Sequence, residues 1–204
     1  ENWCFKVYHL LDININSNHE YFQYKNDLLT TNDGHVIIFA KRNIRFLNLP
    51  EDVQKNFPSA FYSCKKITSF CLKSTIIDCI GRHAFCECKK LKIVVISTTN
   101  NLTIGEKCFA FCELLNVIDI KCDSSVLEDF CFECCKSLPK LDFNVKTISF
   151  CQNSISGCEQ LKSICIPDAD DINIQEKSFI SLSQFQSIHL KQRNLKFQIL
   201  IYHQ

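Results

Sequence analysis

Thiols and imidazoles are the side chains of this sequence most suited to chemistry, with 15 cysteines and 6 histidines in 204 residues. Cys131 and Cys134 form a Cys-x-x-Cys pair, and His83 lies close to Cys86 and Cys88. Structural zinc sites use such residues but need four ligands, often as two such pairs. The sequence holds no second Cys-x-x-Cys. No local signature of a cysteine nucleophile accompanies the histidines. We therefore expect no metal site and no catalytic residue.

Cofactor chemistry has little support in the sequence. The chain has only four glycines, at Gly34, Gly81, Gly105 and Gly157, and no phosphate-cradling loop, dinucleotide fingerprint or Gly-x-Ser-x-Gly turn. A net charge of +1 gives no electrostatic case for nucleic-acid binding. No apolar stretch reaches the length of a transmembrane helix. We expect a protein that is not an enzyme and uses no cofactor or small-molecule substrate.

The positions of the cysteines are more informative than their chemistry. Five recur every 23 or 24 residues: Cys64, Cys88, Cys112, Cys135 and Cys158. Three residues before each stands a large apolar residue, and this slot recurs once more: Phe61, Phe85, Phe109, Phe132, Ile155 and Phe179. A fixed period of this length indicates a solenoid of stacked rungs.

The remaining apolar positions predict the elements of each rung. Val94 and Ile96 lie nine and eleven residues after Phe85, so they share one face of a short strand. Stacked rungs pair such strands into a parallel sheet, about 4.8 Å apart. Spacings of three from Phe85 to Cys88 and on to Leu91 favour a helical or 3₁₀ turn. A single rung cannot offset the entropy of ordering about 23 residues, so only neighbouring rungs make it stable.

Cysteines that repeat at one inward position have parallel Cβ directions, which is poor disulfide geometry. We expect these five to be buried free thiols that act as small hydrophobes. If the chain is secreted, disulfides remain open among the off-pattern cysteines: Cys4, Cys71, Cys79, Cys86, Cys122, Cys134, Cys151 and Cys165.

The rungs resemble the BspA-type leucine-rich repeat. The repeat pattern appears in the segment 80–96, which begins Ile80-Gly81 and continues through Phe85 and Cys88, and again in the segment 104–120. The resemblance covers residues 44–191. It implies the α/β class: a right-handed leucine-rich-repeat solenoid of about six rungs, with a parallel concave sheet and short helical or 3₁₀ convex turns. It carries over no catalytic residue. Similar proteins are surface or secreted adhesion and recognition proteins.

Three segments follow from this pattern. Residues 1–43 form an N-terminal segment with a capping hairpin, whose turn at Thr31–Gly34 precedes a returning strand at Val36–Phe39. Residues 44–191 hold the repeats and begin with a strand at 44–50. Residues 192–204 add a C-terminal strand or a truncated repeat. The resemblance implies the cell surface or secretion, but no signal peptide is visible and the cysteine pattern suits a reducing compartment, so the localisation stays open.

The outward strand positions define a candidate binding surface. Most are small or polar, but three adjacent ones are aliphatic, and charged residues surround them. The candidate site residues are Ile93, Val95, Val117, Asp119, Lys121, Lys140 and Asp142. This pattern favours a surface that binds a protein partner, although β-branched residues also favour strands for their own sake. Two functions follow: a recognition or adhesion module that binds protein through the concave face, or a structural scaffold or surface coat without a dedicated ligand.

Overall fold

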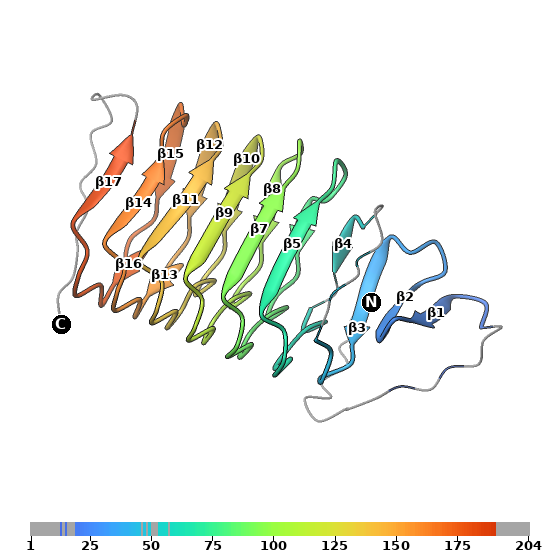
Figure 1. Cartoon of the computed structure of the whole chain (residues 1–204). Coiled ribbons are helices and arrows are strands. Elements are labelled where there is room, and N and C mark those ends of the chain that lie inside the picture. The colour runs from blue at the N-terminus through green and yellow to red at the C-terminus, as the bar shows by residue number, and fades with distance from the viewer. Residues whose placement is uncertain are drawn as a thin grey trace.

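The computed structural model describes residues 13, 15, 19–45, 47, 49, 53–56 and 58–190. They form an elongated stack of similar coils, with strands from successive coils lying side by side (Figure 1). The repeats form a parallel β-solenoid of about five turns. The described residues contain strands and turns but no helix.

The predicted parallel sheet is present and is called the front sheet here. Its six strands run in the order β17-β14-β11-β9-β7-β5. Their bounds are β5 Ser69–Lys73, β7 Ile93–Ser97, β9 Val117–Lys121, β11 Lys140–Asn144, β14 Ser163–Ile166 and β17 Ser187–Leu190. Ile93 pairs with Ser69 on one side and Val117 on the other, so neighbouring strands are offset by one sequence period.

A second sheet, the back sheet, was not predicted. It has nine strands in the order β1-β2-β3-β4-β6-β8-β10-β12-β15. Their bounds are β1 Phe22–Lys25, β2 Leu28–Thr31, β3 Val36–Ala40, β4 Lys55–Asn56, β6 Cys79–Ile80, β8 Leu102–Ile104, β10 Ser124–Leu127, β12 Thr147–Phe150 and β15 Asp171–Ile174. A short parallel pair joins β13 (Ile155–Ser156) to β16 (Phe179–Ile180). The prediction of the α/β class was therefore wrong for the described residues, which are all-β.

The expected helical or 3₁₀ turns are successive β-turns in the structure. Around Phe85, His83 and Glu87 both have a positive φ, 55° and 61°. This left-handed backbone lets the Phe85 N–H donate to the carbonyl of Cys108 in the next rung, at 2.8 Å. Residues three apart fit either kind of turn, and most of the left-handed positions in the rungs hold residues such as Glu87, Lys107 and Phe111 that do not favour this conformation. The spacing alone therefore could not distinguish them.

The core of the solenoid is the repeated aromatic slot. Phe109 is fully buried and stacks on Phe85 and Phe132, with ring centroids 5.3 and 5.4 Å apart and nearly parallel planes. Phe61 continues the stack onto Phe85 at 4.6 Å. These contacts confirm the predicted repeat register. They also join neighbouring rungs into one hydrophobic core.

The five repeated cysteines are buried, as predicted. Four of their thiols donate to the carbonyl of the aromatic residue in the preceding rung. The Cys88 Sγ lies 3.1 Å from the Phe61 oxygen, and the Cys112 Sγ lies 3.2 Å from that of Phe85. Burial raises the pKa of Cys64 to about 11, and it also raises the pKa of Cys88, Cys112 and Cys135. Each such thiol both fills its slot and provides a weak hydrogen bond between rungs.

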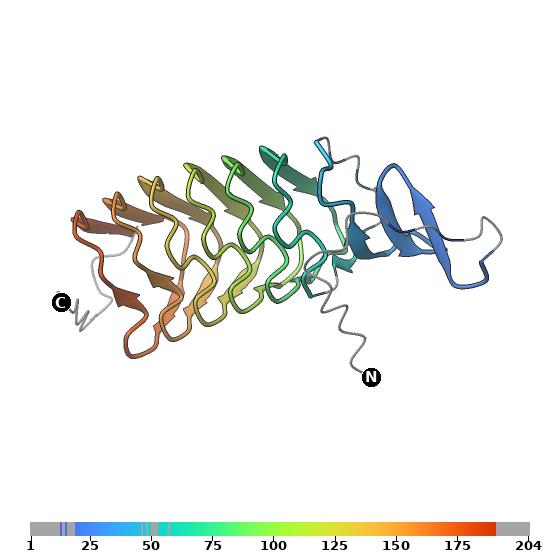
Figure 2. The same cartoon turned by 90° about the horizontal axis from the view of Figure 1, so that it is seen from below.

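The predicted hairpin is present, because β2 and β3 pair antiparallel around the turn at Thr31–Gly34, and β1 adds a third antiparallel strand to form a meander (Figure 2). The expected outgoing arm is divided into β1 and β2, because Asn26 and Asp27 form a tight turn with φ values of 54° and 63°. Two successive left-handed residues are typical of a type I′ turn. Strand β3 then pairs in parallel with β4, so the meander continues the back sheet.

Two other predictions concern strands at the two ends of the repeats. Of the strand expected at 44–50, the structure describes Ile44, Arg45, Leu47 and Leu49, and none of these four belongs to a strand. The described front sheet therefore begins at β5. The strand or truncated repeat expected at 192–204 lies outside the described residues.

Candidate functional site

Three aliphatic side chains lie together on the outward face of the front sheet. Ile93 and Val117 pair directly across β7 and β9, and their exposed fractions are 39% and 43%. Val95 lies two residues along β7 and is half-buried. The alternate residues Val94 and Ile118 are buried in the core. This arrangement confirms the predicted strand orientation. Ile93, Val95 and Val117 are called the apolar patch below.

The charged residues predicted around the apolar patch also lie on this face. Asp119 pairs in register with Val95 on one side and Asp142 on the other. The Lys140 Nζ lies 2.9 Å from Oδ2 of Asp142, and this hydrogen bond raises the pKa of Lys140. Lys121 is exposed at the end of β9. The structure thus brings all seven predicted residues together on β7, β9 and β11.

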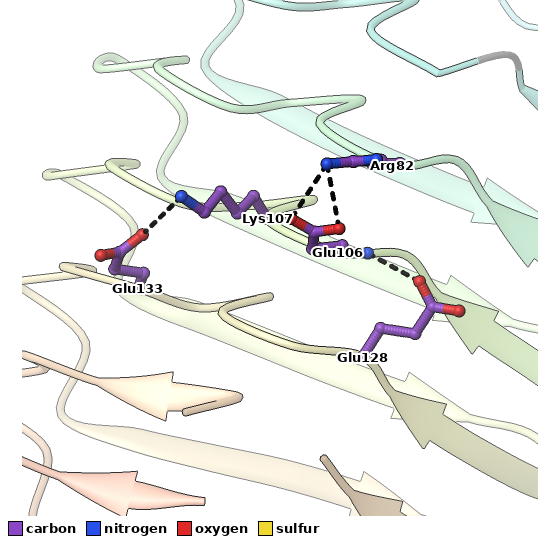
Figure 3. A network of polar contacts seen from close by, with 5 residues as sticks. All are labelled: Arg82, Glu106, Lys107, Glu128 and Glu133. Atoms are coloured by element: carbon purple, nitrogen blue, oxygen red, sulfur yellow. Dashed lines mark hydrogen bonds and ion pairs between the residues drawn. The ribbon is translucent and has the colours of Figure 1, made fainter. Parts of the chain in front are cut away.

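A network of charged side chains also links neighbouring rungs on the back-sheet side (Figure 3). An oxygen of Glu106 lies 3.1 Å from Arg82, and the Glu106 N–H donates to Glu128 at 2.8 Å. Lys107 lies 3.8 Å from a carboxylate oxygen of Glu133. Each of these charges already has a partner within the stack. The network therefore contributes to rung stacking rather than to a ligand site.

Cys86, Cys131 and His83 are poorly suited to nucleophilic catalysis. A nucleophilic cysteine needs a lowered pKa, whereas burial raises the pKa of Cys86 to about 12 and that of Cys131 well above its ordinary value. Burial also lowers the pKa of His83, which favours its neutral form. No cluster of three or more histidine, cysteine or acidic side chains suited to a metal ion exists in the part of the chain that the structure describes.

One surface feature was not singled out by the sequence reasoning. Arg45, Lys66, Thr68 and Lys90 line an open pocket of about 340 Å³, next to the start of the front sheet. A signal was available, because the second lysines of Lys65–Lys66 and Lys89–Lys90 occupy the same position in successive rungs. The net charge of +1 for the whole chain does not reveal such a local cluster of positive charge.

The described part of the chain contains no helix long and apolar enough to span a membrane.

The profile of the family described as "BspA type Leucine rich repeat region" matches residues 36–122 and 102–200, with six copies of the repeat. No protein of curated function matches the sequence.

Several solved structures share the fold. The pneumococcal vaccine antigen PcpA is 17% identical, with a TM-score of 0.52, over 84% of this chain and 37% of that chain. A leucine-rich repeat protein from Bacteroides ovatus is 21% identical, with a TM-score of 0.51, over 76% of this chain and 42% of that chain. The T. pallidum leucine-rich repeat protein is 16% identical, with a TM-score of 0.52, over 81% of this chain and 88% of that chain. The match thus spans less than half the length of the first two proteins, and at these identities the likeness concerns the fold alone.

Proposed function

Since this chain belongs to the BspA-type leucine-rich repeat family, we propose that it is a non-enzymatic recognition or adhesion module. It binds a protein partner through the apolar patch on the front sheet. The family supplies a rigid repeat scaffold, and the site on this scaffold comes from the side chains of this particular chain.

The observation that carries the proposal is the exposure of Ile93 and Val117 side by side. Strand propensity alone does not require aliphatic residues at these positions. In neighbouring strands of the same sheet the paired positions hold Ser69 on one side and Lys140 and Ser163 on the other. A partner that covers the patch removes apolar surface from water, at about 25 cal/mol per Å².

The charged rim gives such a contact its orientation. Asp119 and Asp142 lie next to each other in register, and Lys121 and Lys140 flank them. An apolar centre with a polar rim is the common anatomy of protein interfaces. We expect a partner with an aliphatic or aromatic anchor for the centre and a basic group near the two carboxylates.

The test uses the double substitution Val95→Lys with Val117→Lys. Both side chains lie outside the buried core, so the fold is retained, and two ammonium groups now occupy the apolar contact. A peptide selected from a random display library on the wild-type protein serves as the probe, and its binding is measured by calorimetry. We expect the double variant to weaken binding by about 2 kcal/mol or more, as for a hot spot.

The matched control is Ile76→Lys with Val126→Lys. These residues are 39% and 37% exposed and lie outside the front-sheet strands, so the same charges are added elsewhere. Circular dichroism checks the fold of both variants. Equal binding by the two well-folded double variants would contradict the proposed site. If no selected peptide is sensitive to the patch substitutions, a scaffold or coat protein without a dedicated ligand becomes the better description.

A further inference from the structure

Seven ion pairs join a cation to a carboxylate among the described residues. The Lys89 Nζ lies 3.1 Å from Glu113, and the Lys136 Nζ lies 3.4 Å from Glu159. In each pair the two residues come from successive rungs. Each such pair places opposite charges next to each other and reduces the repulsion between cations of neighbouring rungs.

Arg45, Lys66 and Lys90 are three cations that gather at one pocket. None of the three forms an ion pair with a carboxylate among the described residues. All three are exposed, and together with Thr68 they line the pocket of about 340 Å³. Among the described residues no acidic side chain lines this pocket, and Asp27, which lines the adjoining pocket with Arg45 and Lys66, forms an ion pair with Lys41. Three positive charges and one hydroxyl group therefore surround a single open volume.

The pocket also lies in the basic part of an unevenly charged chain. Residues 41–92 contain 11 basic residues (lysine or arginine) and 4 acidic residues. Residues 93–190 contain 7 basic residues and 13 acidic residues. The net charge of +1 hides this difference. A local excess of one sign raises the concentration of oppositely charged ligands near the surface. The field along this solenoid therefore directs anions toward its N-terminal rungs.

We propose that this pocket binds a tetrahedral oxyanion, namely a sulfate or phosphate group, either free or as an ester on a saccharide. A carboxylate has two oxygens and one charge, too few for three cations and a hydroxyl group. A sulfate or phosphate offers three or four oxygens. The planar guanidinium of Arg45 can donate to two of them, and the ammonium groups of Lys66 and Lys90 act as point charges on the others.

This site is separate from the proposed protein-binding surface. Thr68 immediately precedes β5, and Lys90 precedes β7 by three residues, so the pocket lies before the strands on which the apolar patch stands. The two proposals can therefore fail independently. Substitution of the apolar patch should leave anion binding unchanged, and substitution of the pocket should leave peptide binding unchanged.

The experiment is a titration of the purified chain at low salt with four probes: inorganic sulfate, inorganic phosphate, a heparin-derived oligosaccharide and its desulfated counterpart. We expect the first three to bind, the desulfated oligosaccharide not to bind, and binding to weaken at high salt because the contact is exposed. An oligosaccharide that binds more tightly than inorganic sulfate identifies an ester on a saccharide as the source. Equal affinities identify the free anion.

The deciding variant is Lys66→Ala with Lys90→Ala. It removes two of the three cations, and we expect it to lower the affinity for sulfate by at least about tenfold, as for charged hydrogen bonds. Its matched control, Lys136→Ala with Lys162→Ala, removes the same charge from later rungs. Both sets of side chains are exposed, so the melting temperature should not change. Failure of all three anions to bind would overturn the proposal, and so would an equal loss in the control.

Discussion

Removal of the Phe109 ring provides the most direct test of the stacked core. The side chain is fully buried in the middle of the aromatic stack, with Phe85 and Phe132 on either side at 5.3 and 5.4 Å. The substitution Phe109→Ala leaves a cavity bounded by two rungs. Large-to-small aromatic changes in cores cost about 3–5 kcal/mol. Two lost ring contacts, each worth about 0.5–1.5 kcal/mol beyond the buried area, place this site at the upper end of that range.

The assay is urea unfolding followed by far-UV circular dichroism. The free energy of unfolding falls by about 2 kcal/mol per molar urea. A variant that loses about 4 kcal/mol of this free energy therefore has its unfolding midpoint lowered by about 2 M urea. Because each interior rung supports both neighbours, we expect one transition that shifts as a whole.

Phe111→Ala is the matched control. Phe111 lies in the same turn but is only half-buried, and we expect its loss to cost about 1 kcal/mol or less. An unchanged midpoint for Phe109→Ala, or equal shifts for the two variants, would refute the stacked-core account.

Two further outcomes follow from the packing of the rungs. Gly105→Ala should destabilise the fold by about 1–3 kcal/mol in the same assay, because an added Cβ would lie 2.6 Å from the backbone nitrogen of Arg82 and force two rungs apart. A stability equal to wild type would show that the rungs separate without cost. Alkaline pH should also destabilise the fold. Burial raises the pKa of Cys64 to about 11 and that of Cys86 to about 12, from an ordinary value near 9. The unfolded chain therefore loses these protons first, and the stabilisation, complete below about pH 9, is lost as pH rises through the folded pKa values. Each such thiol contributes about 1.4 kcal/mol per pH unit between its two pKa values. Urea midpoints from pH 7 to 11 measure the slope, and Cys64→Ala should make it shallower; an identical slope would contradict the assignment.

Much of the front sheet could be predicted because its signals are local and repeated. Residues 93–96 are all aliphatic, so the side that faces the core is specified by the positions of Val94 and Ile96 nine and eleven residues after Phe85, as in the other rungs. A strand has a side-chain period of two, and a solenoid repeats it at a fixed interval. The register between rungs then follows without knowledge of the tertiary structure. For the same reason all seven candidate site residues could be placed on one face.

The back sheet and its turns required the tertiary structure. Glu87, Lys107 and Phe111 adopt positive φ although their residue types give no sign of it. Left-handed backbone at such residues is unfavourable in isolation and persists where the surroundings stabilise it. Here the N–H of Glu87 donates to the carbonyl of Ala110 in the next rung, at 2.9 Å. The conformation depends on a neighbour 23 residues away, so local sequence could not reveal it.

The pocket lined by Arg45, Lys66, Thr68 and Lys90 also depends partly on the sequence pattern and partly on the tertiary structure. The sequence by itself determined the repeat, the buried aromatic and cysteine slots and the outward position of Lys66 and Lys90. Only the tertiary structure brought Arg45 beside these lysines and left all three without a carboxylate partner among the described residues. A repeat places equivalent side chains by period. Ion pairing depends on which charges meet across rungs, and that is decided by the three-dimensional packing of the chain.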